Sequence, residues 1–248
     1  MMEKTIDARG VYYRLLNDRI QEAVKDGATK IILTGVNGQR YIGTRVDRPV
    51  EIEIEGVPGN DLGAYMNGST IIVRDNGQDA IGNTMNSGKI VIHGHAGDVL
   101  GYAMRGGKLF IRGDVGYRVG IHMKEYGANI PILVIGGSAG SFLGEYMAGG
   151  ILVILGLNRK PGEPVAGDYL GTGMHGGVIY LRGNVDEAGL GKEVAVFELD
   201  AADEERLEKL LCEYCRDMDI DYEEVREEKF VKLVPVSRRP YGNLYTHA

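Results

Sequence analysis

A glycine-anchored phrase recurs at a fixed interval along the middle of the chain. It reads G-x-x-M-x-G-G-x-[IL]-x-[IVL]-x-G with some drift, and three successive spacings are 19 residues. The register then resumes after insertions of five and eight residues. The leading glycines are Gly63, Gly82, Gly101, Gly120, Gly144 and Gly171. Self-similarity at such a period predicts a repeat architecture, in which each unit buries its apolar face against its neighbours.

Three columns of the repeat are apolar and predict the inward face of each coil. The first lies three residues after the leading glycine and holds six of the nine methionines: Met66, Met85, Met104, Met123, Met147 and Met174. The second and third lie eight and ten residues after it, as in Ile71 and Val73 or Ile90 and Ile92. Because alternate residues of a strand point to the same side, both columns face one way.

The repeat indicates a β-solenoid. Between the inward columns lie only glycine-rich turns and β runs of four or five residues, which are too short for helices. The L-x-x-L-x-L skeleton of leucine-rich repeats is missing, and a hexapeptide β-helix would need coils that are multiples of six. The remaining choice is an all-β solenoid, a right-handed parallel β-helix of about seven coils, with 38 glycines of 248 residues at its turns.

The two ends of the chain are predicted to be helical. Residues 1–29 carry an amphipathic helix with Val11, Leu15, Leu16, Ile20 and Val24 on one stripe, and Gly27 ends it. Residues 30–198 form the β-helix, which starts with a strand at 30–34. Residues 199–248 form an acidic helix and an extended tail. We expect both helices to cap solenoid ends, which otherwise expose core and strand edges.

The C-terminal helix has its own signals. Its apolar stripe is Leu207, Leu210, Leu211, Tyr214 and Met218, and Asp200 or Asp203 is the expected N-terminal cap.

Outward positions of the strands carry a basic ladder and an apolar patch. The ladder is Arg74, Arg112 and Arg182, with His93 in the same column, and the patch is Ile151, Val153 and Leu155. Three outward apolar residues in one coil are too many for a solvent-exposed face, so we expect the patch to be covered by other protein atoms. Two covers stay open, a partner protein that contacts both ladder and patch, or the terminal helices of this chain.

Two motifs resemble binding sites but lack the required context. Residues 171–176, GTGMHG, match G-x-G-x-x-G, yet they lead into a strand, whereas a dinucleotide site needs a helix there. Cys212 and Cys215 form a C-x-x-C with no second pair, inside the predicted acidic helix. We therefore expect neither nucleotide binding nor zinc or redox chemistry at these places.

Histidines and aspartates recur with the coils, and each set has a structural explanation. His93 and His95 would need a third ligand to hold a metal, with His122 and His175 as candidates in later coils. One aspartate per coil is typical of turn residues that bind main-chain amides, and the alternative is a catalytic carboxylate pair. The aspartates are Asp61, Asp79, Asp98, Asp114 and Asp168. We assign no catalytic, cofactor-binding or metal-binding residue to this chain.

Charge and hydropathy exclude two classes of partner. The formal net charge is -7, with fourteen acidic against six basic residues in 198–232, which disfavours a nucleic-acid binder. No apolar run reaches the roughly 20 residues of a membrane helix, and the N-terminus lacks a secretory signal. We expect a cytoplasmic protein.

Several of these phrases resemble a known domain. GEYMAGGILVILG (144–156) and GTGMHGGVIYL (171–181) are similar to the GXGXG domain at the C-terminal end of the glutamate synthase large subunit. The coils in 60–120, the turn GVNGQRYIG (35–43) and the closing FVKLVP (230–235) also resemble that domain, so the likeness covers most of the chain. The resemblance implies a right-handed β-helix without catalytic residues.

The resemblance also implies partners. In the full enzyme a glutaminase domain releases ammonia, and a domain with FMN and an iron-sulfur cluster uses it to aminate 2-oxoglutarate. This chain shows neither domain, so it is expected to be a standalone scaffold subunit of a split, archaeal-type glutamate synthase, with the cofactors on partner subunits.

Other assignments stay open at this point. The first alternative is the C subunit of a formylmethanofuran dehydrogenase-type molybdenum or tungsten enzyme, which resembles the same β-helix. The second is a free-standing carbohydrate-active β-helix, which predicts an aromatic- and acid-lined groove. Association of identical copies through strand edges is also open.

Overall fold

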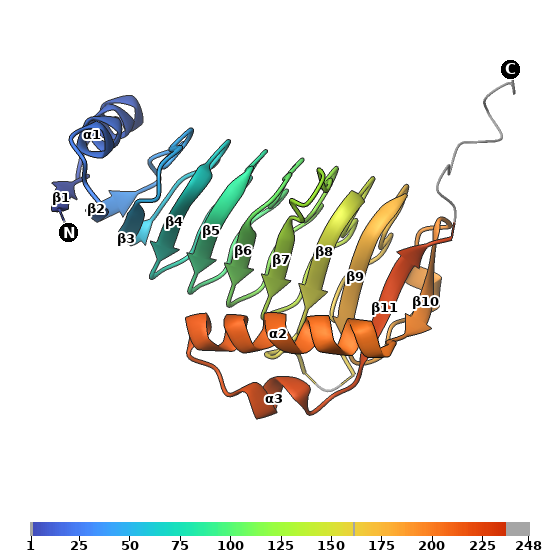
Figure 1. Ribbon diagram of the computed structural model, residues 1–248. Helices are drawn as coiled ribbons and strands as arrows, with labels where there is room; N and C mark the ends of the chain where they lie inside the picture. Colours follow the sequence, from blue (N-terminus) through green and yellow to red (C-terminus); the bar gives the residue numbers. More distant parts are fainter. Residues whose placement is uncertain (1, 161, 237–248) are drawn as a thin grey trace, which may run out of the picture.

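A computed structural model shows the chain as a single β-solenoid and describes residues 2–160 and 162–236. Eleven strands form one sheet in the order β1-β2-β3-β4-β5-β6-β7-β8-β9-β11-β10. Strands β1 to β9 are parallel and succeed one another along the solenoid axis, which gives about six turns (Figure 1). The predicted solenoid of parallel strands is confirmed, with a turn count close to the expected seven.

The elements follow the chain in simple order. The strands are β1 (Glu3–Asp7), β2 (Lys30–Asn37), β3 (Glu51–Val57), β4 (Asn67–Val73), β5 (Ser87–Ile92), β6 (Lys108–Ile111), β7 (Ile132–Ile135), β8 (Ala148–Ile154), β9 (Gly176–Arg182), β10 (Val194–Glu198) and β11 (Phe230–Pro235). The helices are α1 (Tyr13–Lys25), the 3-10 helix η1 (Glu187–Gly189), α2 (Ala201–Met218) and α3 (Tyr222–Arg226).

The interior is filled by the columns that the repeat predicts. All six repeat methionines are completely buried. Ile90 is paired with Ile71 on one side and Leu109 on the other, and the same ladder continues through Leu133 and Leu152. Leu133 cannot be assigned to this ladder from the repeat period, because the five-residue insertion lies before β7 and shifts that strand along the chain.

The leading glycines lie across the interior from the strands. A Cβ on Gly63 would be 2.5 Å from Cδ1 of Ile90, and the φ of Gly63 is +66°. The residues two before and two after it, Asp61 and Tyr65, also have positive φ, at 60° and 57°. Glycine is therefore required at the leading position for space, whereas its neighbours adopt the same left-handed backbone with a side chain.

Helix α1 caps the first coil. Its buried residues are Leu16, Ile20, Ala23 and Val24, which belong to the solenoid core. Leu15 is 55% exposed, so its place on the predicted stripe is wrong. The helix ends at Lys25, and Gly27 has a φ of +92° as expected for a residue just past a helix end. A strand before it, β1, extends the sheet beyond β2 and was not predicted.

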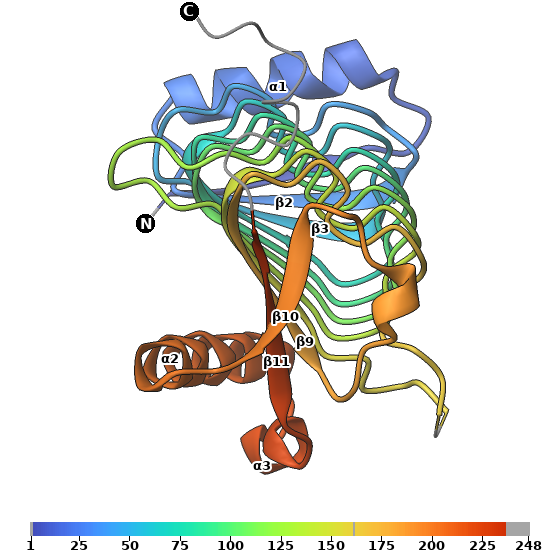
Figure 2. The same cartoon turned by 90° about the vertical axis from the view of Figure 1, so that its right-hand side faces the viewer.

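Helix α2 does not cap the second end. It crosses the outward face of the sheet, and the end is closed instead by the antiparallel strands β11 and β10 (Figures 1 and 2). The expected cap of the helix itself is confirmed, because the Asp200 carboxylate accepts from the N–H groups of Ala202 and Asp203. The predicted tail beyond residue 236 lies outside the described residues.

An outer core joins α2 to the sheet. Phe110 and Tyr214 meet edge to face at 5.5 Å, and the Tyr214 hydroxyl donates to the carbonyl of Ile111 over 3.0 Å. Burial raises the pKa of Tyr214, which keeps it a neutral donor. The strand residues of the outer core are Val91, Phe110, Val134, Ile151, Val153, Leu155 and Tyr180. The whole predicted stripe of α2 is buried against them.

Ion pairs border the outer core. The ammonium of Lys89 lies 2.6 Å from Glu213 and 2.7 Å from Asp217, and Lys108 also binds Glu213. Burial alone would raise the pKa of Glu213, but hydrogen bonds from Lys108 and Lys89 lower it overall. At the other end of α2, the Tyr180 hydroxyl donates to Asp203 over 2.6 Å.

The close approach at the leading glycines predicts a stability effect. We expect Gly120→Ala to lower the free energy of unfolding by about 2–4 kcal/mol, from left-handed strain and overpacking together. The added Cβ would lie 2.8 and 3.0 Å from the two Cδ atoms of Leu152. Gly127→Ala is the matched control, since Gly127 also has positive φ but open space around its Cβ position. Urea unfolding measures both, and equal losses would contradict the packing argument.

The Glu213 pairs predict a pH dependence. Because the folded-state pKa is lowered, their stabilisation is complete above the unfolded value, near 4.5, and is lost as pH falls through the folded pKa. Glu213→Gln should therefore cost about 1–2 kcal/mol at pH 7 and progressively less below pH ~4.5. Glu205→Gln, which breaks an exposed pair with Lys209, should cost less than about 0.5 kcal/mol. Thermal unfolding at several pH values tests this, and a pH-independent gap would refute it.

Candidate interaction surfaces

The predicted apolar patch is covered by this chain. Ile151, Val153 and Leu155 are only 7%, 0% and 0% exposed, because α2 and α3 lie on them. Of the two covers left open by the sequence, the terminal helices are the one that the structure shows. The hypothesis that this patch contacts a partner protein is therefore wrong for the described chain.

The basic ladder is divided between two environments. Arg182 is 5% exposed and donates to the carbonyls of Val225 and Glu224, which fixes α3 against β9. Arg112 donates to the carbonyl of Met218 at the end of α2. Both arginines hold the C-terminal segment. Arg182 is buried there, so its assignment to a partner surface is wrong, whereas Arg112 stays exposed and its contact with a partner remains a prediction.

Arg74 is also exposed. It lies beyond α2, with its Nε 3.1 Å from Glu53 and one guanidinium nitrogen 3.2 Å from His93. Partial burial and the positive charges of Arg74 and Arg112 lower the pKa of His93. A partner contact at Arg74 stays a prediction.

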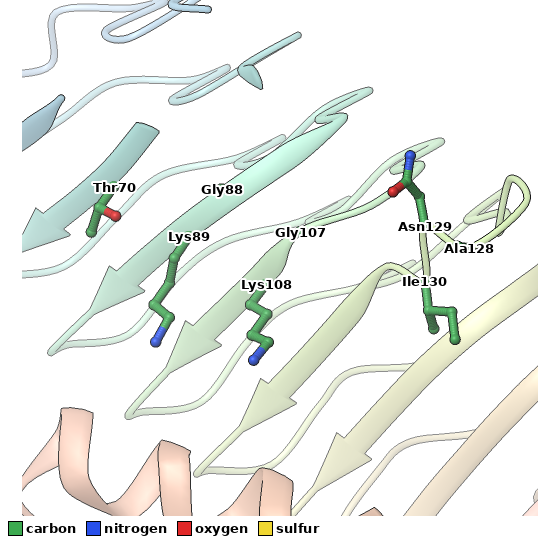
Figure 3. A pocket seen from close by; sticks show the side chains of 8 residues that line it. All are labelled: Thr70, Gly88, Lys89, Gly107, Lys108, Ala128, Asn129 and Ile130. Atoms are coloured by element: carbon green, nitrogen blue, oxygen red, sulfur yellow. The ribbon is translucent and has the colours of Figure 1, made fainter. Parts of the chain in front are cut away.

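A hollow of about 410 Å³ opens on the outward face beside α2. It is lined by Thr70, Gly88, Lys89, Gly107, Lys108, Ala128, Asn129 and Ile130. Figure 3 shows Lys89 and Lys108 extending side by side from neighbouring strands, with the inserted loop before β7 on the opposite rim. Because both ammonium groups already pair with carboxylates of α2, the hollow offers little free positive charge, and we assign no ligand to it.

Four exposed tyrosines lie close in sequence to the leading glycines, on turn segments that face the strands across the interior. We call Tyr65, Tyr102, Tyr117 and Tyr169 the tyrosine row; each lies within three residues of a leading glycine and is between 41% and 57% exposed. Because the leading glycines pack across the interior from the strands, this turn side is opposite the covered face (Figure 2).

Two members of the tyrosine row, Tyr102 and Tyr169, make ring contacts with a neighbouring coil. Tyr169 stacks on Phe142 at 4.8 Å, and Tyr102 meets His122 edge to face at 5.9 Å. The guanidinium of Arg118 lies 4.7 Å from the Phe142 ring and binds the Glu145 carboxylate over 2.8 Å. Tyr102 and Tyr169 thus present packed aromatic rings with a polar hydroxyl, and exposed aromatic residues are enriched in protein interfaces.

The histidines of the repeat do not gather into a metal site. His93 lies beside Arg74, and the His95 ring nitrogen Nδ1 accepts from the Asp114 N–H over 2.9 Å. His122 stacks on Tyr146, and His175 lies against the carbonyl of Gly173. Within residues 2–160 and 162–236, no three His, Cys, Asp or Glu side chains are placed to hold a metal ion.

Three of the five recurring aspartates bind the backbone of the next coil. Asp79 accepts from the N–H of Asp98, Asp98 from that of Tyr117, and Asp114 from that of Ser138, at 2.8–2.9 Å. The sequence predicts main-chain partners but places them in the aspartate's own turn, whereas the structure places them in the next coil. The carboxylate of Asp61 instead accepts from the side-chain amide of Asn83 over 2.9 Å.

The cysteine and glycine motifs are structural parts of the fold. Cys215 is buried and its pKa is raised to about 11, chiefly by burial, so it is a poor nucleophile at neutral pH. Cys212 is exposed, and the two thiols are unbonded. GTGMHG runs into β9 and not into a helix, which is the context that argues against a dinucleotide site.

Comparison with known proteins agrees with this fold. The model of the GXGXG motif family matches residues 16–236. Uncharacterized protein MJ1350 of Methanocaldococcus jannaschii is 46% identical over 255 residues, which cover 99% of this chain and 97% of that protein.

A solved structure shares the architecture at low identity. It is a chain of the formyltransferase/hydrolase complex FhcABCD from Methylorubrum extorquens, in complex with methylofuran. The TM-score is 0.61 and the sequence identity 21%, over 91% of this chain and 88% of that chain, so the likeness concerns the fold. The family match runs from within α1 to the end of β11 and covers most of the solenoid, and the chain belongs to the GXGXG motif family.

Proposed function

We propose that this protein is a non-catalytic scaffold subunit of a split glutamate synthase, which forms glutamate from glutamine and 2-oxoglutarate in the cytoplasm. The observation that carries the proposal is the family match over residues 16–236. The resemblance of its repeat phrases to the large subunit of that enzyme gives the reaction.

The structure supports a scaffold role through its rigidity. Backbone pairing is continuous from β1 to β9, and the interior between strands and turns is filled by apolar ladders. A solenoid of this kind transmits little internal motion along its axis. It is suited to hold two partner domains at a fixed separation.

The proposed partners are a glutaminase-type subunit and a subunit that carries FMN and the iron-sulfur cluster. The tyrosine row is the surface that fits such a contact, since α2 covers much of the outward face of the sheet and the interior is filled. Rigid aromatic side chains lose little conformational entropy on binding.

A second candidate is the C subunit of a formylmethanofuran dehydrogenase-type enzyme with molybdenum or tungsten. The observation that favours it is the fold shared with a chain of the FhcABCD complex. The two candidates agree on a scaffold role and differ in the partners.

Purification of the tagged chain from its own organism separates the candidates. We expect glutaminase-like and FMN-binding chains to copurify, and glutamine-dependent glutamate formation to require the scaffold when the subunits are recombined. Molybdopterin-enzyme chains in the purified complex would favour the second candidate instead. Full activity of the other subunits without this chain would refute the scaffold role.

The tyrosine row predicts where the partners bind. Tyr102→Ser combined with Tyr169→Ser should weaken binding of a purified partner subunit at least about tenfold, because exposed aromatic anchors dominate interface energies. Tyr126→Ser is the matched control, since Tyr126 is 76% exposed but lies on the loop before β7. Titration by calorimetry measures the affinities, with thermal unfolding to confirm that each variant folds. An unchanged affinity would exclude this surface.

A further inference from the structure

The two ends of the strand ladder are protected to different degrees. The first edge strand, β1, has the sequence EKTID, in which charged side chains discourage pairing with another chain. The last edge strand, β10, reads VAVFE and has no lysine or proline within it. It lies at the outer end of the stack in both views (Figures 1 and 2), and its Phe197 is 45% exposed.

The hydrogen-bonding groups of β10 alternate between its two sides. Glu193 accepts from the N–H of Val236 on the β11 side, and Pro235, opposite Val194, has no N–H to donate. In an antiparallel pair, hydrogen-bonded and non-hydrogen-bonded positions alternate. Val194, Val196 and Glu198 therefore direct their peptide groups away from β11, towards the free edge.

Most of these edge groups lack a partner in the described part of the chain. The N–H of Val194 donates to the Gly191 carbonyl over 3.4 Å. Within the described residues, no hydrogen bond outside the β10–β11 pair reaches the peptide groups of Val196, the carbonyl of Val194 or the N–H of Glu198. The carbonyl of Glu198 receives no hydrogen bond from the described residues either, so the edge offers two donors and three acceptors.

We propose that this edge pairs with the same edge of a second copy, so that two solenoids join end to end through antiparallel β10 strands. With Val196 on the two-fold axis, the two Val196 residues exchange both of their hydrogen bonds. The N–H of each Glu198 then meets the carbonyl of Val194 in the other copy. Both donors and two of the three acceptors of one edge are satisfied by the other edge. The N–H of Val194 keeps its partner in its own chain, and the carbonyl of the exposed Glu198 at the strand end remains free.

The side chains favour the same register. Phe197 of each copy lies opposite Ala195 of the other on the outward face, so a large ring faces a small residue. Beyond the strand ends, the exposed Lys192 of one copy lies towards Asp200 of the other, which brings opposite charges together. This self-complementarity favours a second copy of the chain over an unrelated strand.

The full-length chain tests the pairing through its oligomeric state. We expect a concentration-dependent equilibrium between the 27.0 kDa monomer and a dimer in analytical ultracentrifugation. Val196→Pro removes an N–H that points to the free edge, where proline is tolerated in a sheet, and should weaken dimerisation about tenfold or more. Thr5→Lys, an exposed change on the opposite edge strand, is the control and should leave dimerisation unchanged.

A cysteine on the two-fold axis tests the register. In a Cys212→Ser background, Val196→Cys should form a disulfide-linked dimer on mild oxidation, because Cα atoms of a hydrogen-bonded pair are about 5.5 Å apart. Phe197→Cys should not, since position 197 faces position 195 of the other copy.

Either of two results would overturn the proposal. One is a chain that stays monomeric over about a hundredfold range of concentration. If removal of residues 237–248 then yields a dimer, the tail and not a second copy occupies the β10 edge, and the proposal is equally wrong. The other is a dimer that Val196→Pro leaves unchanged while the variant keeps the thermal stability of the parent.

Discussion

The thin interior of the solenoid is the constraint on which the rest of the structure depends. Only one layer of side chains separates the strands from the turn side, so the leading glycine of a coil meets the tip of a strand residue directly, as Gly63 meets Ile90. A side chain at that position would push turn and strand apart. Because each coil is hydrogen-bonded to the next, the displacement would be passed along the stack, which explains why the glycine returns in every coil.

Stacking of like residues also decides where α2 lies. One outward column carries Ile32, Glu53 and Ile72 in its first strands, and from β5 onward its residues are Val91, Phe110, Val134, Val153 and Tyr180. The apolar part needs a cover, and the helix supplies a matching stripe with acidic residues that meet Lys89 and Lys108 at its border. Two arginines of the basic ladder also fix the C-terminal segment to the sheet, since Arg112 and Arg182 donate hydrogen bonds to main-chain carbonyls of that segment.

The sequence predicts the inward columns because a fixed period aligns them without any knowledge of the fold. It also identifies the outward patch, but the choice of cover depends on how a distant helix packs, which no local pattern encodes. The tyrosine row is missed for a different reason. Tyr65, Tyr102 and Tyr169 occupy different positions relative to the leading glycine, so they form no column of the repeat. Leu133 is missed because an insertion removes it from the period.

The distribution of polar groups argues for a geometric role. Arg118, Asp98 and His95 are each engaged by a neighbouring coil, so these groups stabilise the stack and are not free to react. With the interior filled and α2 on the outward face, the turn side and the end of the ladder are the directions in which the chain can meet other proteins. These directions are roughly perpendicular, since one runs across the coils and the other along the axis. A partner on the turn side and a second copy at β10 would therefore not compete, and pairing of the scaffold would bring two complexes together without altering either one.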